Sequence, residues 1–235
     1  GLMREMVYNE GTEEEYRQRY SYDEDSRVRL VESSRDGLVW DRDAPYGYYG
    51  HGPLRRITLG EDSVQGIDYV YTIEGWLKGV NRPDVTGSFL MDDDGPGRTN
   101  GDMPKDAFQM TLTYYSGDYA RWHDGVGSGL NSVATSAGAP PNELLLGASL
   151  YNGNISSWSS VTQASGAGGM QYETLNGELY RYDVLNRLLR SEFQTYAGML
   201  WMIPAGNEYW SWYAYDPAGN ITTLRRNGYG GTPGM

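Results

Sequence analysis

A seven-residue frame recurs along this chain and limits what it can fold into. Its clearest copy is Tyr215-Asp216-Pro217-Ala218-Gly219-Asn220-Ile221. Asp at the first turn position, Pro at the second and Gly at the fourth are the residues that a type I turn prefers. Gly219 can adopt a positive φ without a steric penalty, as a three-residue hairpin loop with a bulge requires. The frame therefore predicts the tip of a β-hairpin in which Tyr215 faces Ile221.

The same frame is present at other places in the chain. Further copies begin at Tyr182 (with Asp183, Asn186 in the glycine position, and Arg187), at Tyr22 (with Asp23, Ser26 and Arg27), and at Tyr71 (with Gly75 but without the aspartate). Residues 48–54 form a degenerate copy, residues 153–155 repeat the second half of the frame, and residues 1–3 are expected to do the same. Such repetition predicts an array of supersecondary units, with hairpin tips at 23–26, 72–75, 183–186 and 216–219.

These copies resemble the YD-repeat family, also called the Rhs-repeat family. Its repeats carry Tyr-Asp, two variable residues, Gly, Arg or Asn, and an apolar residue. The stretch from Gln65 to Asn81 is also similar to segments of the large repeat proteins of Bacteroidota. The resemblance covers most of the chain and is weakest between residues 82 and 145.

The resemblance implies a long β-strip that spirals into a hollow shell. In bacterial toxin complexes and polymorphic toxins such a shell encloses a C-terminal toxin domain, and in teneurins a comparable barrel supports adhesion. The family's usual bacterial chain continues after the repeats into a core with Asp-Pro motifs that supports self-cleavage. Nothing in this chain matches that core, because Asp216-Pro217 belongs to a repeat turn. Neither toxin activity nor processing is therefore transferred to this chain.

Composition agrees with an all-β fold. The chain of 235 residues has 21 Tyr against 3 Phe, together with 7 Trp and 32 Gly. Aromatic side chains favour pleated, half-buried surfaces, and glycine favours turns. We predict antiparallel β-hairpin repeats that form a curved strip over residues 1–235, with irregular insertions at about 82–106 and 116–141. Residues 38–40 are expected to continue the meander as a strand.

Charge and motif content argue against several classes of function. The net charge of −12 disfavours nucleic-acid binding by bulk electrostatics. Cysteine is absent, and no apolar run reaches the roughly 18 residues of a membrane span. The dinucleotide, Walker and nucleophile-elbow patterns are absent as well. We therefore expect no cofactor and no enzymatic activity.

Three groups of residues admit both a chemical and a structural interpretation. The pairs Asp23–Arg27 and Asp183–Arg187 resemble acid–base pairs, but the hairpin register makes them cross-strand neighbours at a turn. The acidic stretch 92–102 has the oxygen-rich composition of a calcium loop or of a solvated loop, and its spacing does not follow the EF-hand pattern. His51 and His123 are expected at the surface, without a catalytic partner.

A fourth group is aromatic. Trp201, Trp210 and Trp212 would form a stacking platform for sugars or pack along a face of the sheet. The platform interpretation keeps a carbohydrate-binding function open.

We therefore expect a non-enzymatic scaffold: a segment of a YD-repeat shell that encloses or presents a toxin or effector domain in a secreted or cell-surface bacterial protein. The alternative is a carbohydrate-binding or adhesive surface module. The expected partners are flanking repeats of the same parent chain and an enclosed C-terminal toxin domain. Edge-to-edge self-association is a further expectation, because unpaired strand edges recruit other strands.

Overall fold

β-Hairpins make up the fold, as predicted. The structure is a computed structural model that describes residues 1–81, 94, 103–104, 106–119, 148–166, 169–172, 175–197 and 200–231. These residues form fifteen strands and two short 3-10 helices. The chain divides into two units, Gly1–Tyr69 with Met91–Asp106 and Val70–Leu90 with Ala107–Met235. Among the residues that the structure describes, no helix is long and apolar enough to cross a membrane.

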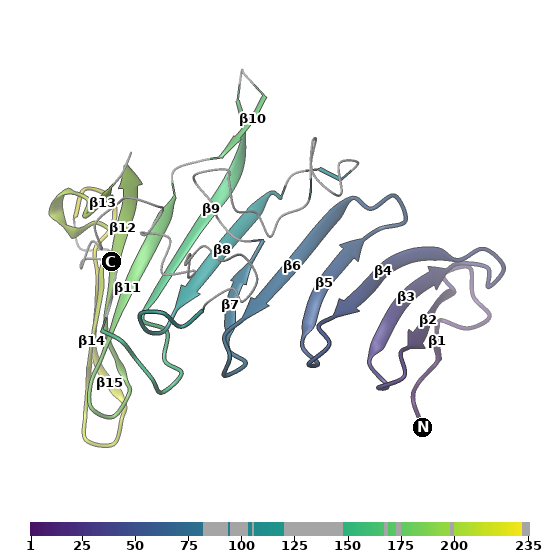
Figure 1. The fold of residues 1–235 in the computed structure, drawn as a ribbon, viewed down its shortest axis with the longest axis horizontal. Helices are drawn as coiled ribbons and strands as arrows, with labels where there is room; N and C mark the ends of the chain where they lie inside the picture. The colour runs from purple at the N-terminus through teal and green to yellow at the C-terminus, as the bar shows by residue number, and fades with distance from the viewer. Residues whose placement is uncertain are drawn as a thin grey trace. The chain divides into compact units, whose positions relative to one another are not determined.

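Unit 1 is an antiparallel meander. Its strands are β1 (Glu5–Tyr8), β2 (Tyr16–Tyr22), β3 (Val28–Ser34), β4 (Asp41–Tyr48), β5 (Leu54–Leu59) and β6 (Gln65–Tyr71), of which β6 runs on into unit 2. Each of these strands pairs with the next one along the chain (Figure 1). The register shifts by one residue just before Tyr22 and just before Tyr48, at the bulges that the turn frame predicts.

Unit 2 continues the same construction. Its strands are β7 (Leu77–Val80), β8 (Phe108–Thr113), β9 (Ser157–Gly166), β10 (Gly169–Tyr172), β11 (Asn176–Tyr182), β12 (Leu188–Ala197), β13 (Leu200–Met202), β14 (Ser211–Tyr215) and β15 (Ile221–Arg226), with helices η1 (Ala205–Asn207) and η2 (Tyr229–Gly231). The antiparallel order is β7-β8-β9-β11-β12-β14-β15, with β10 on β9 and β13 on β12 (Figure 1). A small apolar core joins Val161, Leu175, Leu179 and Trp201, and Tyr196 packs against it.

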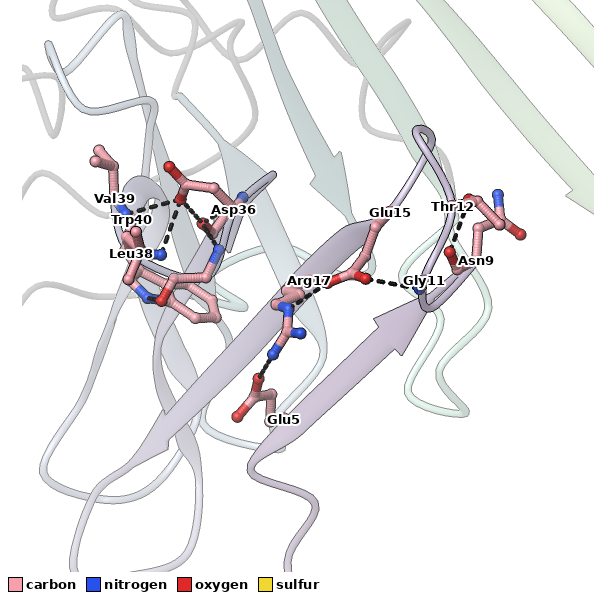
Figure 2. Close-up of polar contacts among 12 residues, drawn as sticks. Glu5, Asn9, Gly11, Thr12, Glu15, Arg17, Asp36, Leu38, Val39 and Trp40 are labelled. Atoms are coloured by element: carbon pink, nitrogen blue, oxygen red, sulfur yellow. Dashed lines mark hydrogen bonds and ion pairs between the residues drawn. The ribbon is translucent and has the colours of Figure 1, made fainter.

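The segment between β3 and β4 corrects one expectation. Residues 38–40 form a loop, and the next strand begins at Asp41. Asp36 causes the difference, because its Oδ1 accepts hydrogen bonds from the backbone N–H groups of Leu38 and Val39 at 2.8 and 2.9 Å (Figure 2). Short polar side chains that bond to the backbone in this way compete with strand pairing. Leu38 and Val39 consequently lie exposed at the surface.

Charged side chains fix the neighbouring loop between β1 and β2. Glu15 accepts a hydrogen bond from the backbone N–H of Gly11 at 2.8 Å and forms an ion pair with Arg17 Nε at 2.7 Å (Figure 2). The Gly11 bond and the Arg17 guanidinium lower the pKa of Glu15. Arg17 also reaches Glu5 on β1 at 3.5 Å. The chain Glu5–Arg17–Glu15 therefore ties the loop to both strands that it connects.

The expected insertions at 82–106 and 116–141 fall mainly outside the described residues. The curvature of the strip as a whole stays a prediction.

Candidate functional site

The turn frame has one repeated geometry. Its seven positions are numbered here 1 for the tyrosine to 7 for the apolar residue. In the copies at 22, 48, 71, 182 and 215, the N–H of position 2 donates to the carbonyl of position 6, and the N–H of position 5 donates to the carbonyl of position 2. Position 5 has a positive φ in each: Ser26 65°, Gly52 118°, Gly75 85°, Asn186 62° and Gly219 91°. The predicted hairpin tips are confirmed, including the degenerate copy.

The aspartate at position 2 organises the inside of the turn. Asp183 Oδ1 accepts from the backbone N–H groups of Leu185 and Arg187, both at 2.9 Å, and its Oδ2 pairs with Arg187 Nε at 2.6 Å. The backbone bond from Arg187 is the main cause that lowers the pKa of Asp183. The carboxylate is therefore a turn constraint, and this supports the structural interpretation of the Asp183–Arg187 pair.

The other two aspartates behave in the same manner. Asp23 accepts from the backbone N–H groups of Asp25 and Arg27 and pairs with Arg27 Nε at 2.7 Å. Burial works to raise the pKa of Asp23, but these hydrogen bonds outweigh it and leave the pKa below its ordinary value. Asp216 has Asn220 as its partner, with the Nδ2 amide donating to Oδ2 at 2.9 Å, and this bond is the main cause that lowers the pKa of Asp216.

A tyrosine at position 1 joins one hairpin to the preceding one at five described junctions, four of them in the copies at 22, 48, 182 and 215 and one at Tyr114. Its hydroxyl donates to a backbone carbonyl at the start of the preceding hairpin's second strand, a contact called here the inter-hairpin tyrosine bond. Five such bonds are described: Tyr22 to Met3 (2.6 Å), Tyr48 to Val28 (2.7 Å), Tyr114 to Leu77 (2.8 Å), Tyr182 to Ile155 (2.9 Å) and Tyr215 to Leu188 (2.7 Å). In every case the acceptor occupies position 7 of a full or partial copy of the frame.

Strand register explains why position 1 reaches this carbonyl. The pair Arg190↔Trp212 in β12 and β14, extended by two residues, places residue 214 opposite Leu188. Tyr215 is the next residue, so its ring lies beside the start of β12 and its hydroxyl meets the carbonyl. Burial raises the pKa of Tyr48, Tyr114 and Tyr182 above its ordinary value, which is already well above neutral pH, so these hydroxyls are protonated donors.

In two copies of the frame an arginine at position 6 covers the tyrosine ring of the following hairpin. The guanidinium carbon of Arg27 lies 4.4 Å from the centre of the Tyr48 ring, and that of Arg187 lies 4.7 Å from the centre of the Tyr215 ring. Arg187 Nη1 also donates to the Asp216 carbonyl at 3.1 Å. One arginine therefore binds its own turn through the aspartate and the next hairpin through the ring and the backbone.

Trp76 plays the same part where the frame lacks arginine. It occupies position 6 of the copy that begins at Tyr71, and its ring centre lies 4.9 Å from that of Tyr114. Trp76 also contacts the turn at Gly153, where a Cβ atom would lie 3.3 Å from the indole ring. Sequence reasoning did not identify Tyr114 as a frame tyrosine, because its turn has the positive φ at Gly117, one residue earlier than elsewhere.

The tryptophans proposed as a sugar platform lie in different environments. Trp201 and Trp210 are buried, with 4% and 8% of their surface exposed, and Trp212 is half-buried. The ring of Trp201 covers Gly177. The ring centres of Trp210 and Trp212 lie 5.8 Å apart. Buried rings cannot stack on a sugar, so Trp212 alone of the three keeps an accessible ring.

The remaining candidates have little support from the described residues. His51 stacks on Tyr49 in a turn, with ring centres 5.3 Å apart, and His123 lies outside the described residues. Of the acidic stretch 92–102 only Asp94 is described, and it pairs with Arg56 at 2.5 Å. Within the described part of the chain, metal-binding groups of three or more His, Asp or Glu residues are absent.

Two ion-pair sites, one fully buried at Lys78 and one partly buried at Arg56, were not anticipated from the sequence. Lys78 Nζ lies 2.7 Å from Asp118 Oδ1, and both side chains are fully buried. Asp118 also accepts the backbone N–H of Tyr114 at 2.8 Å, so the pair holds the turn that carries a frame tyrosine. Arg56 in β5 pairs with Asp68 opposite it in β6 and with Asp94. No sequence signal marks these pairs, because their partners are distant along the chain.

Comparisons with known proteins give structural neighbours only. No family model and no curated protein matches the chain. Among solved structures, the chain is similar to part of the crystal structure of TcdB2-TccC3-Cdc42, with 13% identity and a TM-score of 0.35 over 86% of this chain and 9% of that chain. It is also similar to part of the crystal structure of TcdB2-TccC3-TEV, with 11% identity and a TM-score of 0.30 over 91% of this chain and 10% of that chain. The chain thus spans a small fraction of both neighbours.

Proposed function

We propose that this chain is a non-enzymatic structural scaffold, a segment of a hollow β-shell of the YD-repeat kind. The inter-hairpin tyrosine bond, present at five described junctions, is the observation that supports this proposal. The polar groups of the frame serve assembly: the aspartate binds its own turn, the arginine binds the aspartate and the next ring, and the tyrosine binds the preceding strand.

The proposal extends to what the shell does. The shell encloses or presents a toxin or effector domain in a secreted or cell-surface bacterial protein. The support for this part is the resemblance of the frame to YD repeats. Limited proteolysis of the parent protein tests it: the enclosed domain resists protease in the native shell and becomes sensitive when Tyr182→Phe and Tyr215→Phe loosen two junctions. Equal sensitivity in both proteins would contradict enclosure.

A glycan array separates the scaffold from the adhesive alternative. The scaffold shows no saturable binding to any sugar on the array. An adhesive module shows saturable binding that is lost in Trp212→Ala and kept in Trp40→Ala, a matched change at a half-buried tryptophan of unit 1. Saturable binding with this dependence would replace the scaffold proposal.

A further inference from the structure

The tripeptide Gly-Asn-Ile occupies positions 5 to 7 of the frame twice, at residues 153–155 and 219–221. The two glycines have nearly the same backbone conformation, with φ of 85° at Gly153 and 91° at Gly219. At the first copy, the Ile155 carbonyl accepts the hydroxyl of Tyr182 at 2.9 Å. The tripeptide is therefore a demonstrated acceptor for a frame tyrosine.

The second copy leads into an open strand edge. All residues of β15 are exposed, including Ile221 at 56% and Leu224 at 49%. Among the strands described in unit 2, β15 pairs only with β14. Its second edge thus presents backbone groups in the setting where β9 receives β11 and β12 receives β14.

We propose that this edge of β15 is the docking surface for a further β-hairpin of the tyrosine frame, whose position-1 hydroxyl donates to the Ile221 carbonyl. The incoming strand runs antiparallel to β15 and ends in the tyrosine, as β11 and β14 do at their own junctions. This inference rests on the scaffold function proposed above and names the partner that the scaffold takes at this edge.

Position 6 sets how firmly that partner is held. Asn220 stands where Arg187 stands in the preceding copy, and its amide is bonded to Asp216. The docked tyrosine therefore lacks the guanidinium that covers Tyr215. The junction at Ile155 also has an asparagine, Asn154, at position 6, and its tyrosine bond still forms. The Ile221 junction is accordingly usable but weaker than the Leu188 junction.

Register identifies a suitable hairpin from the chain itself. With the residue before the tyrosine opposite Ile221, a hairpin copied from residues 175–197 places Gly177 and Asn176 opposite Arg225 and Arg226. Like charges directly opposite each other in a sheet are destabilising, and this pairing avoids them.

The test extends the full chain beyond residue 235 by a flexible Gly/Ser linker and a second copy of residues 175–197. A tether keeps the hairpin at high local concentration, on the order of millimolar. Amide hydrogen exchange of β15 is read by mass spectrometry. We expect slower exchange than in the unextended chain.

Changing the appended tyrosine that corresponds to Tyr182 to phenylalanine reduces this protection by about fivefold, the effect of one hydrogen bond. The matched control changes the appended tyrosine that corresponds to Tyr180 to phenylalanine, and this change should leave the protection of β15 intact.

Two results would overturn the proposal: unchanged exchange of β15 in the extended chain, or equal protection by the tyrosine and phenylalanine versions. Tyr182→Phe at its original position distinguishes this failure from failure of the scaffold. If that change destabilises the chain while the appended hairpin protects nothing, the inference about β15 falls and the scaffold stands. If neither has an effect, both proposals fall.

Discussion

The Tyr182 hydroxyl lies 2.9 Å from the carbonyl oxygen of Ile155, a residue 27 positions earlier in the sequence, and so joins two successive turns. The acceptor is a backbone atom, so the side chain at position 7 is free to vary. This accounts for the mixture of apolar residues that accept a frame tyrosine: Met3, Val28, Leu77, Ile155 and Leu188. Position 1, by contrast, needs a hydroxyl at the end of a long rigid ring, which tyrosine alone supplies.

The contact between Arg187 and the Tyr215 ring should be measurable as a coupling energy. Arg187→Met and Tyr215→Leu, combined in a double-mutant cycle, should give about 0.5–1 kcal/mol in the free energy of unfolding in urea. The control cycle pairs Arg187→Met with Tyr213→Leu, which lies on the same strand, and should be additive. Zero coupling in the first cycle would show that the guanidinium does not stabilise the next hairpin.

Gly219 should resist substitution by any residue with a branched side chain. Its φ of 91° is costly for an L-residue, so Gly219→Val should destabilise unit 2 by about 1 kcal/mol or more. Ala218→Val at the neighbouring turn position is the control and should have a smaller effect. Urea unfolding followed by circular dichroism gives both values. Equal effects of the two changes would mean that the positive φ is not required.

The hydrogen bonds of the Asp183 carboxylate should make the stability of the fold depend on pH. Its pKa in the folded chain lies below the ordinary value of 3.8. The carboxylate therefore stabilises the fold above that value, and its contribution is lost as the pH falls through the folded pKa. Asp183→Asn should destabilise the chain at pH 7, and the difference from the original chain should shrink as the pH drops below 3.8. Glu10→Gln, at an exposed loop position, is the control for thermal melts across this range. A difference that is constant with pH would contradict the assignment.

Gly177 should be required by Trp201. A Cβ atom at residue 177 would lie 2.7 and 2.9 Å from two atoms of the Trp201 indole ring, so the ring or the strand would have to shift. Gly177→Ala should cost about 1–3 kcal/mol, as overpacking does, and should change the near-UV circular dichroism of the tryptophans. Gly47→Ala in β4 is a suitable control, because its new Cβ would meet neighbours no closer than 3.6 Å. Similar costs at both sites would mean that the ring shifts freely.

The turns were predictable because their chemistry is local. Asp183 bonds to the backbone of Arg187, four residues away, and Asn186 takes its positive φ within the same turn. The local sequence pattern therefore contains the whole interaction. The copy at 48–54 is degenerate in sequence and lacks the aspartate, and Gly52 nevertheless has the positive φ of the frame.

The contacts between hairpins were not predictable from local chemistry. Tyr114 and Leu77 are 37 residues apart, and the order of strands must be known before their contact can be foreseen. The burial of Trp201 depends likewise on Gly177 in another strand. The pair Arg27–Asp23 was identified as a turn contact, but its second role, over the Tyr48 ring, exists only once the next hairpin is in place.

Urea unfolding of Tyr182→Phe tests the central claim most directly, because the change removes one hydroxyl and keeps the ring. The account predicts a loss of about 0.5–1.5 kcal/mol, the usual net value of one hydrogen bond, and faster amide exchange in the turn at residues 151–155. Tyr151→Phe is the matched control: that ring is exposed and stacks on Tyr115, and the change should be nearly neutral. A Tyr182→Phe chain as stable as the original, with unchanged exchange in that turn, would contradict the claim that frame tyrosines join the hairpins.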